Sequence, residues 1–156
     1  LLKCAMARGV HLIAEDAIAI ETNANGVVVK TSGGQPLNES DRLVIAAGVW
    51  SRSLAKQVGD HIPLDTERGY NATFAPGSFG VGRPVAYEGE GFVTTPLATG
   101  DRVGGAVEFA GLKAEPNHQR TRAMVHRLRH FLPHLDPDLQ SKQWMGFRPS
   151  IPDSLP

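Results

Sequence analysis

The sequence Q-W-M-G-F-R-P-S-I-P-D-S-L-P, residues 143–156, contains a short apolar run and then an arginine among prolines. The run from Gln143 to Phe147 predicts a strand. Arg148 follows, where Pro149 and Pro152 stiffen the backbone and remove hydrogen-bond donors. An arginine in such a rigid position can bind a carboxylate through two parallel hydrogen bonds. The alternative is an arginine at a strand end that is solvated or paired with a nearby acid.

Working outward from this segment, the residue pattern favours short strands and a few helices. Asn25-Gly26 is a strong hairpin signal between two extended runs, and a continuous apolar run at 43–47 predicts a strand buried on both faces. Apolar residues at helical spacing before Pro133 predict a helix over 117–132. Shorter helices are expected at 1–8 and 50–58, and strands at 10–13, 17–22, 27–31, 83–87, 91–96, 102–109 and 143–147. This mixture predicts the α+β class.

Size and composition limit the partners. The 156 residues are 41% hydrophobic, enough for one domain or the larger part of one. Lys+Arg and Asp+Glu are both 16, so the formal net charge of zero gives no reason to expect a nucleic-acid partner. Cys4 is the only cysteine, which excludes an internal disulfide. No apolar run approaches the roughly 20 residues of a membrane span, so we expect no integral membrane segment.

His126, His130 and His134 recur every four residues, a spacing at which histidines can share a metal. Pro133 breaks helical geometry before the third of them, and no acidic or thiol ligand lies close in sequence. We therefore predict no metal site. The neighbouring basic residues indicate a solvated helix face rather than a nucleic-acid contact: Arg120, Arg122, Arg127 and Arg129.

The motif Gly146-Phe147-Arg148-Pro149, followed by Pro152-Asp153 and Pro156, resembles the G-x-R-P-x-x-P-D-x-x-P segment of the D-amino-acid oxidase-like, FAD-dependent oxidoreductases. That family includes glycine oxidase, sarcosine oxidase and the D-amino-acid dehydrogenases, and the chain looks closest to the last. The resemblance implies that Arg148 holds the substrate carboxylate over the flavin. The family's N-terminal G-x-G-x-x-G fingerprint and last flavin-binding segment do not appear in the chain. We therefore expect a fragment that is inactive by itself.

The run L-V-I-A-A-G-V-W-S, residues 43–51, resembles the V-I-A-A-G-x-W-S-like strand end that lies against FAD in this family. The resemblance implies cofactor contacts from Ala46, Ala47, Gly48 and Trp50. Small residues there would let the cofactor approach the backbone closely. Ala17 falls in a second segment that resembles the family's adenine contact. A buried strand packed tightly under a helix would explain the small residues almost as well.

The sequence P-L-D-T-E-R-G-Y, residues 63–70, resembles the family's crossing from the FAD domain into the substrate domain. We therefore predict a partial α/β FAD-binding domain at 1–62, a mixed-sheet substrate-binding domain with helices on one face at 63–147, and a return segment at 148–156. Tyr70 and Phe92 are predicted to line the substrate pocket with Arg148. A tyrosine in a strand core is an equal alternative for Tyr70.

The resemblance implies oxidation of the C–N bond of a D-amino acid or related amine to an imino acid, with hydride transfer to FAD and either a quinone or oxygen as the final acceptor. It implies a cytoplasmic enzyme, with peripheral association with the inner membrane as an alternative location. Two other interpretations stay open. One is a non-catalytic binding domain of flavoprotein ancestry, and the other is an oxidoreductase domain serving another enzyme, for instance one that acts on modified RNA.

Overall fold

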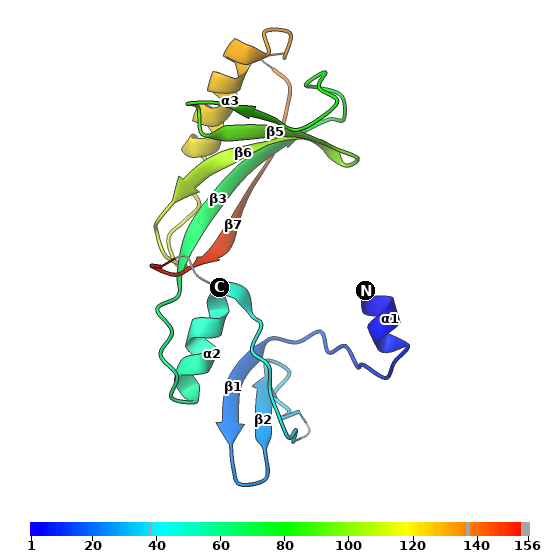
Figure 1. Cartoon of the computed structure of the whole chain (residues 1–156), viewed down its shortest axis with the longest axis vertical. Coiled ribbons are helices and arrows are strands. Elements are labelled where there is room, and N and C mark those ends of the chain that lie inside the picture. Colours follow the sequence, from blue (N-terminus) through cyan, green and yellow to red (C-terminus); the bar gives the residue numbers. More distant parts are fainter. Residues whose placement is uncertain (38, 137, 154–156) are drawn as a thin grey trace. The chain divides into compact units, whose positions relative to one another are not determined.

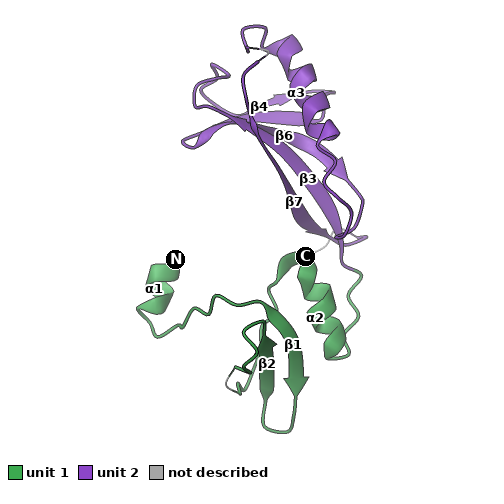
Figure 2. Cartoon of the chain, turned by 180° about the vertical axis from the view of Figure 1, so that it is seen from behind, with its two compact units in different colours: residues 1–63 green, residues 64–156 purple. Residues whose placement is uncertain are grey.

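The computed structural model describes residues 1–37, 39–136 and 138–153, so Pro156 of the predicted motif lies outside the described residues. The chain divides into two compact units, Leu1–Pro63 and Leu64–Pro156 (Figure 2). Helices, a two-stranded sheet and a five-stranded sheet confirm the predicted α+β class. The last strand runs through Ser150, so the expected break between 147 and 148 falls inside a strand.

Unit 1 contains a hairpin with a short helix beside it. Its elements are α1 (Leu2–Met6), β1 (Ala17–Thr22), β2 (Val27–Thr31), the 3-10 turn η1 (Gly48–Trp50) and α2 (Ser51–Gln57). Gln57, the last residue of α2, bonds to the backbone of β1. Its side-chain oxygen accepts the Ile20 N–H at 2.9 Å, and its amide donates to the Ile18 carbonyl at 3.3 Å. This one side chain thus supplies hydrogen-bond partners to two backbone groups at the edge of β1 and holds α2 against that strand.

Two strands predicted in unit 1 do not form. Residues 10–13 and 43–47 have no regular secondary structure, and Val44 is 86% exposed. An apolar run becomes a buried strand only where a neighbouring strand supplies hydrogen bonds and cover. Among the described residues, no strand pairs with either run. The prediction of a buried strand at 43–47 is therefore wrong for this chain.

Unit 2 is built around one antiparallel sheet with the strand order β4-β5-β6-β3-β7. A single helix of the described part of the unit, α3 (Gln119–Phe131), lies across one face of that sheet (Figure 1). The strands are β3 (Asp65–Phe74), β4 (Val85–Tyr87), β5 (Phe92–Leu97), β6 (Gly100–Glu108) and β7 (Lys142–Ser150). Every described strand pair in it is antiparallel.

The core of unit 2 lies between the sheet and α3. Met124 and Leu128, one helical turn apart, face the sheet and are 5% and 0% exposed. They pack with a cluster from the strands and loops: Ala72, Phe74, Phe79, Phe92, Val103, Leu132 and Leu135. Because successive residues of a strand point to opposite faces, every second residue of β3 is left on the other side of the sheet. That other side carries the candidate substrate site.

Candidate functional site

The sheet face of unit 2 opposite α3 is called the open face here. Its residues at the β3–β7 pairing are Glu67, Gly69, Asn71 and Thr73 on β3, and Trp144, Gly146 and Arg148 on β7. The register sets Glu67 against Arg148 and Asn71 against Trp144. Gly69 lies against Gly146 between these two pairs. Arg148 therefore projects from within a paired strand, two residues before its end, and not from an irregular tail, so the β-ladder fixes its position.

The paired Gly69 and Gly146 form a flat patch, called the glycine floor. A Cβ atom built on Gly146 would lie 2.0 Å from the indole carbon Cη2 of Trp144. A Cβ atom built on Gly69 would lie 3.2 Å from Nη2 of Arg148. The indole and the guanidinium therefore occupy the space above the floor that side chains at these two positions would otherwise fill. This arrangement puts an aromatic ring and a cation beside one shallow surface.

Arg148 has an acidic neighbour across the strand. Its Nη1 donates to Oε2 of Glu67 at 3.2 Å, and the Ser150 hydroxyl donates to the other carboxylate oxygen at 3.3 Å. The Arg148 side chain is 59% exposed and that of Glu67 is 26% exposed. An ion pair this exposed contributes only about 0.2–1 kcal/mol to stability. The guanidinium is thus accessible to a carboxylate from outside the protein.

A hollow of about 330 Å³ lies on the open face at the Trp144 end of the glycine floor. Arg102 holds one wall of it, because its Nε donates to the Thr73 hydroxyl at 3.2 Å. The lining residues are Asn71, Thr73, Thr99, Arg102, Lys142 and Trp144. The hollow is therefore polar and cationic, with one aromatic wall.

Tyr70 and Phe92 lie on the other face of the sheet, Phe92 under α3 and Tyr70 against the residues just before it. Tyr70 is 2% exposed, and its hydroxyl donates to Glu108 at 2.6 Å and accepts the Asn117 N–H at 2.9 Å. Phe92 is 4% exposed and packs against Phe131 at 6.3 Å between ring centroids. The structure does not bring either residue to Arg148. We therefore leave both out of the proposed substrate site, since the body of the sheet separates them from the open face.

A buried polar network surrounds Tyr70. Arg68 is 0% exposed, and its Nε and Nη1 donate to the carbonyls of Gly111 and Glu115 at 2.7 and 3.2 Å. Its guanidinium also lies 3.9 Å from Glu108. The hydrogen bond from Tyr70, helped by the nearby arginines, holds the pKa of Glu108 below its usual value against the opposing effect of burial. This network holds the loop after β6 against β3, so we assign it a role in stabilising the fold.

The residues predicted to contact FAD come together in unit 1. Two hollows of about 620 and 670 Å³ share Ala17, Ala47 and Leu54 in their linings. Trp50 lines the first and Ala46 the second, while Gly48 begins η1 next to them with a φ of +56°. The walls are small or apolar, apart from Asp16 and Ser53 in the first hollow and Glu15 in the second. Such a surface suits the flat, largely apolar face of an adenosine group.

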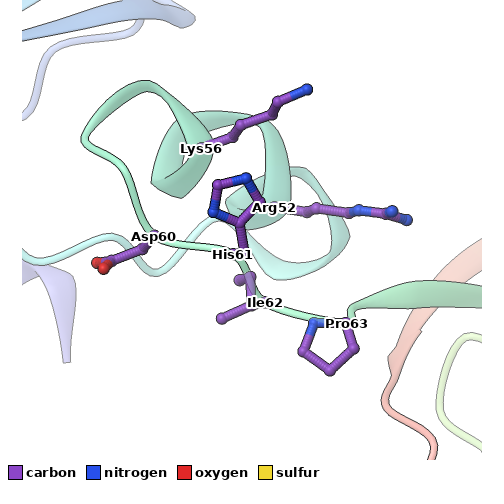
Figure 3. Close-up of a pocket in the computed structure, with 6 residues that line it drawn as sticks. All are labelled: Arg52, Lys56, Asp60, His61, Ile62 and Pro63. Carbon is purple, nitrogen blue, oxygen red and sulfur yellow. The ribbon is translucent and has the colours of Figure 1, made fainter.

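A third hollow of unit 1, of about 500 Å³, lies where α2 ends (Figure 3). Its lining residues are Arg52, Lys56, Asp60, His61, Ile62 and Pro63. Figure 3 shows that Arg52, Lys56 and Asp60 point in three different directions rather than toward one another. A ligand would need charges that converge, so we assign none to this hollow.

In the described part of the chain, no group of three or more His, Cys, Asp or Glu side chains is placed to hold a metal ion. His126 and His130 lie with their ring centroids 5.5 Å apart. None of the helices in residues 1–37, 39–136 and 138–153 has the length and apolar character needed to cross a membrane.

The sequence motif predicted a role for Arg148 but did not point to its neighbours Glu67 and Trp144. The signal that finds them is strand alternation: in W-M-G-F-R, residues 144–148, the tryptophan, glycine and arginine share one face. The same rule applied to E-R-G-Y, residues 67–70, separates Glu67 and Gly69 from Arg68 and Tyr70. The register between the two strands is the part that sequence alone did not supply.

Comparison with known proteins places these features in context. A family model described as FAD dependent oxidoreductase, DAO, matches residues 1–156. A D-amino-acid oxidase of Bradyrhizobium diazoefficiens is 35% identical over 156 residues, covering 97% of this chain and 37% of that protein. A D-amino acid dehydrogenase of Dechloromonas aromatica is 30% identical over 134 residues, covering 84% of this chain and 32% of that protein. The chain thus spans about a third of the length of these relatives.

Solved structures show the same fold. Glycine oxidase from Geobacillus kaustophilus matches with a TM-score of 0.77 and 20% identity, over 91% of this chain and 38% of that one. Glycerol-3-phosphate dehydrogenase from Bacillus halodurans, solved in complex with FAD, matches with a TM-score of 0.76 and 19% identity, over 96% and 34%. At these identities the likeness is one of fold.

Proposed function

Because this chain belongs to the DAO family of FAD-dependent oxidoreductases, we propose that its full-length protein oxidises the C–N bond of a D-amino acid or related amine. FAD is the cofactor of that family, and when bound it supplies the electron acceptor for converting the amine to an imino acid. The named activities of the two curated relatives, a D-amino-acid oxidase and a D-amino acid dehydrogenase, support this substrate class.

The observation that carries the proposal is the position of Arg148 on the open face. Its guanidinium lies above the glycine floor, where no side chain from position 69 or 146 competes for space. It is exposed enough to receive a substrate carboxylate, and the β3–β7 ladder fixes the backbone behind it. A planar guanidinium on a fixed strand can orient a carboxylate through two hydrogen bonds. The α-carbon next to that carboxylate is then held in a defined direction.

Residues of unit 1 fit the adenosine part of the cofactor. We assign this role to Ala17, Ala46, Ala47, Gly48 and Trp50, which lie at or next to the two hollows of that unit. The small side chains leave room for close approach to the backbone, and the Trp50 ring offers a flat wall. These residues hold the cofactor in the proposal, whereas Arg148 acts on the substrate.

The proposal is tested by adding D-amino acids without oxygen to the full-length protein and following its visible absorption spectrum. Bleaching of a flavin spectrum is the expected result. Arg148→Ala should weaken substrate affinity by about 1.5–3 kcal/mol, the contribution of a hydrogen bond to a charged group, because the bound carboxylate would lose its partner. A full-length protein that binds flavin but is reduced by no amino acid, or an Arg148→Ala variant with unchanged affinity and turnover, would refute the assignment.

A further inference from the structure

Glu67 and Arg148 face each other from neighbouring strands on the open face. Their carboxylate and guanidinium are 3.2 Å apart, and the carboxylate is oriented by the Ser150 hydroxyl. Arg148 donates to Glu67 through Nη1. Nη2 lies over Gly69, at the glycine floor. A positive and a negative group are therefore both accessible beside one flat surface.

This charge pattern matches an α-amino acid. Such a molecule carries a carboxylate and an amino group on one carbon, so its two charges are close together and opposite in sign. A ligand beside the guanidinium can give its carboxylate to Arg148 and its amino group to the neighbouring carboxylate of Glu67. A simple carboxylic acid satisfies the guanidinium alone and offers no hydrogen-bond donor to the Glu67 carboxylate.

We infer that Glu67 is a second substrate-binding residue, whose carboxylate accepts a hydrogen bond from the amino group of the substrate that Arg148 holds by its carboxylate. This inference rests on the proposed function and adds a selectivity to it. The Glu67–Arg148 pair distinguishes amino acids from carboxylic acids of the same carbon skeleton. Without substrate, the two side chains satisfy each other, which keeps both at the floor.

The competing explanation is an ordinary cross-strand ion pair that only supports the sheet. Opposite charges across a strand pair contribute about 0.2–1 kcal/mol, so such pairs need no further role. The two explanations differ in what the loss of the carboxylate does to different ligands. A supporting role predicts the same change for every carboxylate ligand of Arg148. A binding role predicts a change only for ligands with an amino group.

The test measures the dissociation constants of matched ligand pairs by anaerobic calorimetry. The pairs are glycine with acetate, D-alanine with propionate, and D-phenylalanine with 3-phenylpropionate. The full-length flavoprotein is reduced beforehand so that bound amino acid is not consumed. Each pair differs only in the amino group. Glu67→Gln keeps the size of the side chain and removes its charge.

Glu67→Gln is expected to weaken binding of the amino acid by about 10- to 100-fold, which is the effect of losing one hydrogen bond to a charged group. Binding of the paired carboxylic acid should stay the same or tighten, because Arg148 loses a competitor. Glu21→Gln is the matched control, since it removes the cross-strand Lys30–Glu21 ion pair of unit 1. Glu21→Gln should change the dissociation constant of neither ligand.

Equal effects of Glu67→Gln on both members of a pair, or no effect on either, would overturn the inference and leave the proposed function standing. Failure of every amino acid to bind the unaltered protein would instead refute the proposed function, and the inference with it. Arg148→Ala separates the two residues further. Arg148→Ala should weaken binding of both ligands of each pair, whereas Glu67→Gln should weaken binding of the amino acid only.

Discussion

Replacing Gly146 by alanine should force the Trp144 indole off the glycine floor. The new Cβ would lie 2.0 Å from Cη2 and 2.6 Å from Cζ2 of the ring. Carbon atoms pack at about 3.5–4.0 Å, so the nearest ring atom must move by about 1.5 Å. Gly146 is not among the glycines with a positive φ, so alanine fits the backbone there and conflicts with the ring.

Two opposing effects set the expected free energy. In a strand, alanine is favoured over glycine by about 0.5–1 kcal/mol. Overpacking against a neighbouring side chain costs about 1–3 kcal/mol. With Trp144 present, Gly146→Ala should therefore be neutral to destabilising. In a Trp144→Ala background the conflict disappears, and the same substitution should stabilise the protein by about 0.5–1 kcal/mol.

Urea unfolding of the unaltered protein, the two single variants and the double variant measures the coupling between positions 144 and 146. We expect a coupling free energy of about 1–3 kcal/mol. Gly69→Ala is a useful comparison, because its Cβ would meet only the end of the flexible Arg148 side chain, at 3.2 Å. A coupling within about 0.5 kcal/mol of zero would show that the ring does not lie over Gly146.

Two further predictions concern the covered face. Arg68→Leu should lower the free energy of unfolding by about 1–3 kcal/mol for each of the two backbone carbonyls that lose their donor, as measured in urea; an unchanged value would contradict the network. Tyr70→Phe should raise the pKa of Glu108 toward its ordinary value of 4.5, because the main cause of its lowering is removed. A carboxyl group whose pKa is lowered in the folded state stabilises the fold at pH values above its ordinary pKa. That stabilisation is lost as the pH falls through the lowered pKa of the folded state. The loss of unfolding free energy in Tyr70→Phe should therefore be larger at pH about 7 than at pH about 3, and equal losses would count against this role.

Local signals in the sequence predicted the local structure well. Asn25-Gly26 forms the turn between β1 and β2, and α3 ends just before Pro133. Both outcomes depend on residues close in sequence: a turn that needs a glycine, and a proline that cannot continue a helix. The apolar run at 43–47 failed as a strand because a strand also depends on a distant partner, which its own residues do not specify.

The candidate site shows the same limit. The motif predicted Arg148 as a site residue, but which residues share its face depends on how β7 pairs with β3. Tyr70 and Phe92 were predicted beside it from resemblance. The pairing puts both on the opposite face, where Phe92 lies under α3 and Tyr70 contacts the residues just before α3. Glu67 went unnoticed because it lies 81 residues from Arg148 in sequence. The two residues become neighbours only through the register of the β3–β7 pairing.

The register itself depends on the buried face. Shifting β3 by one residue relative to its neighbours would turn Arg68 and Tyr70 onto the open face and bury Glu67. Arg68 opposes such a slip, because its guanidinium is bonded to two carbonyls of the loop after β6 and lies 5.5 Å from the Phe147 ring of β7. Phe147 directly precedes Arg148 and pairs with Arg68 in the sheet. The buried arginine thus fixes both strands at the point where Glu67 and Arg148 meet on the other side.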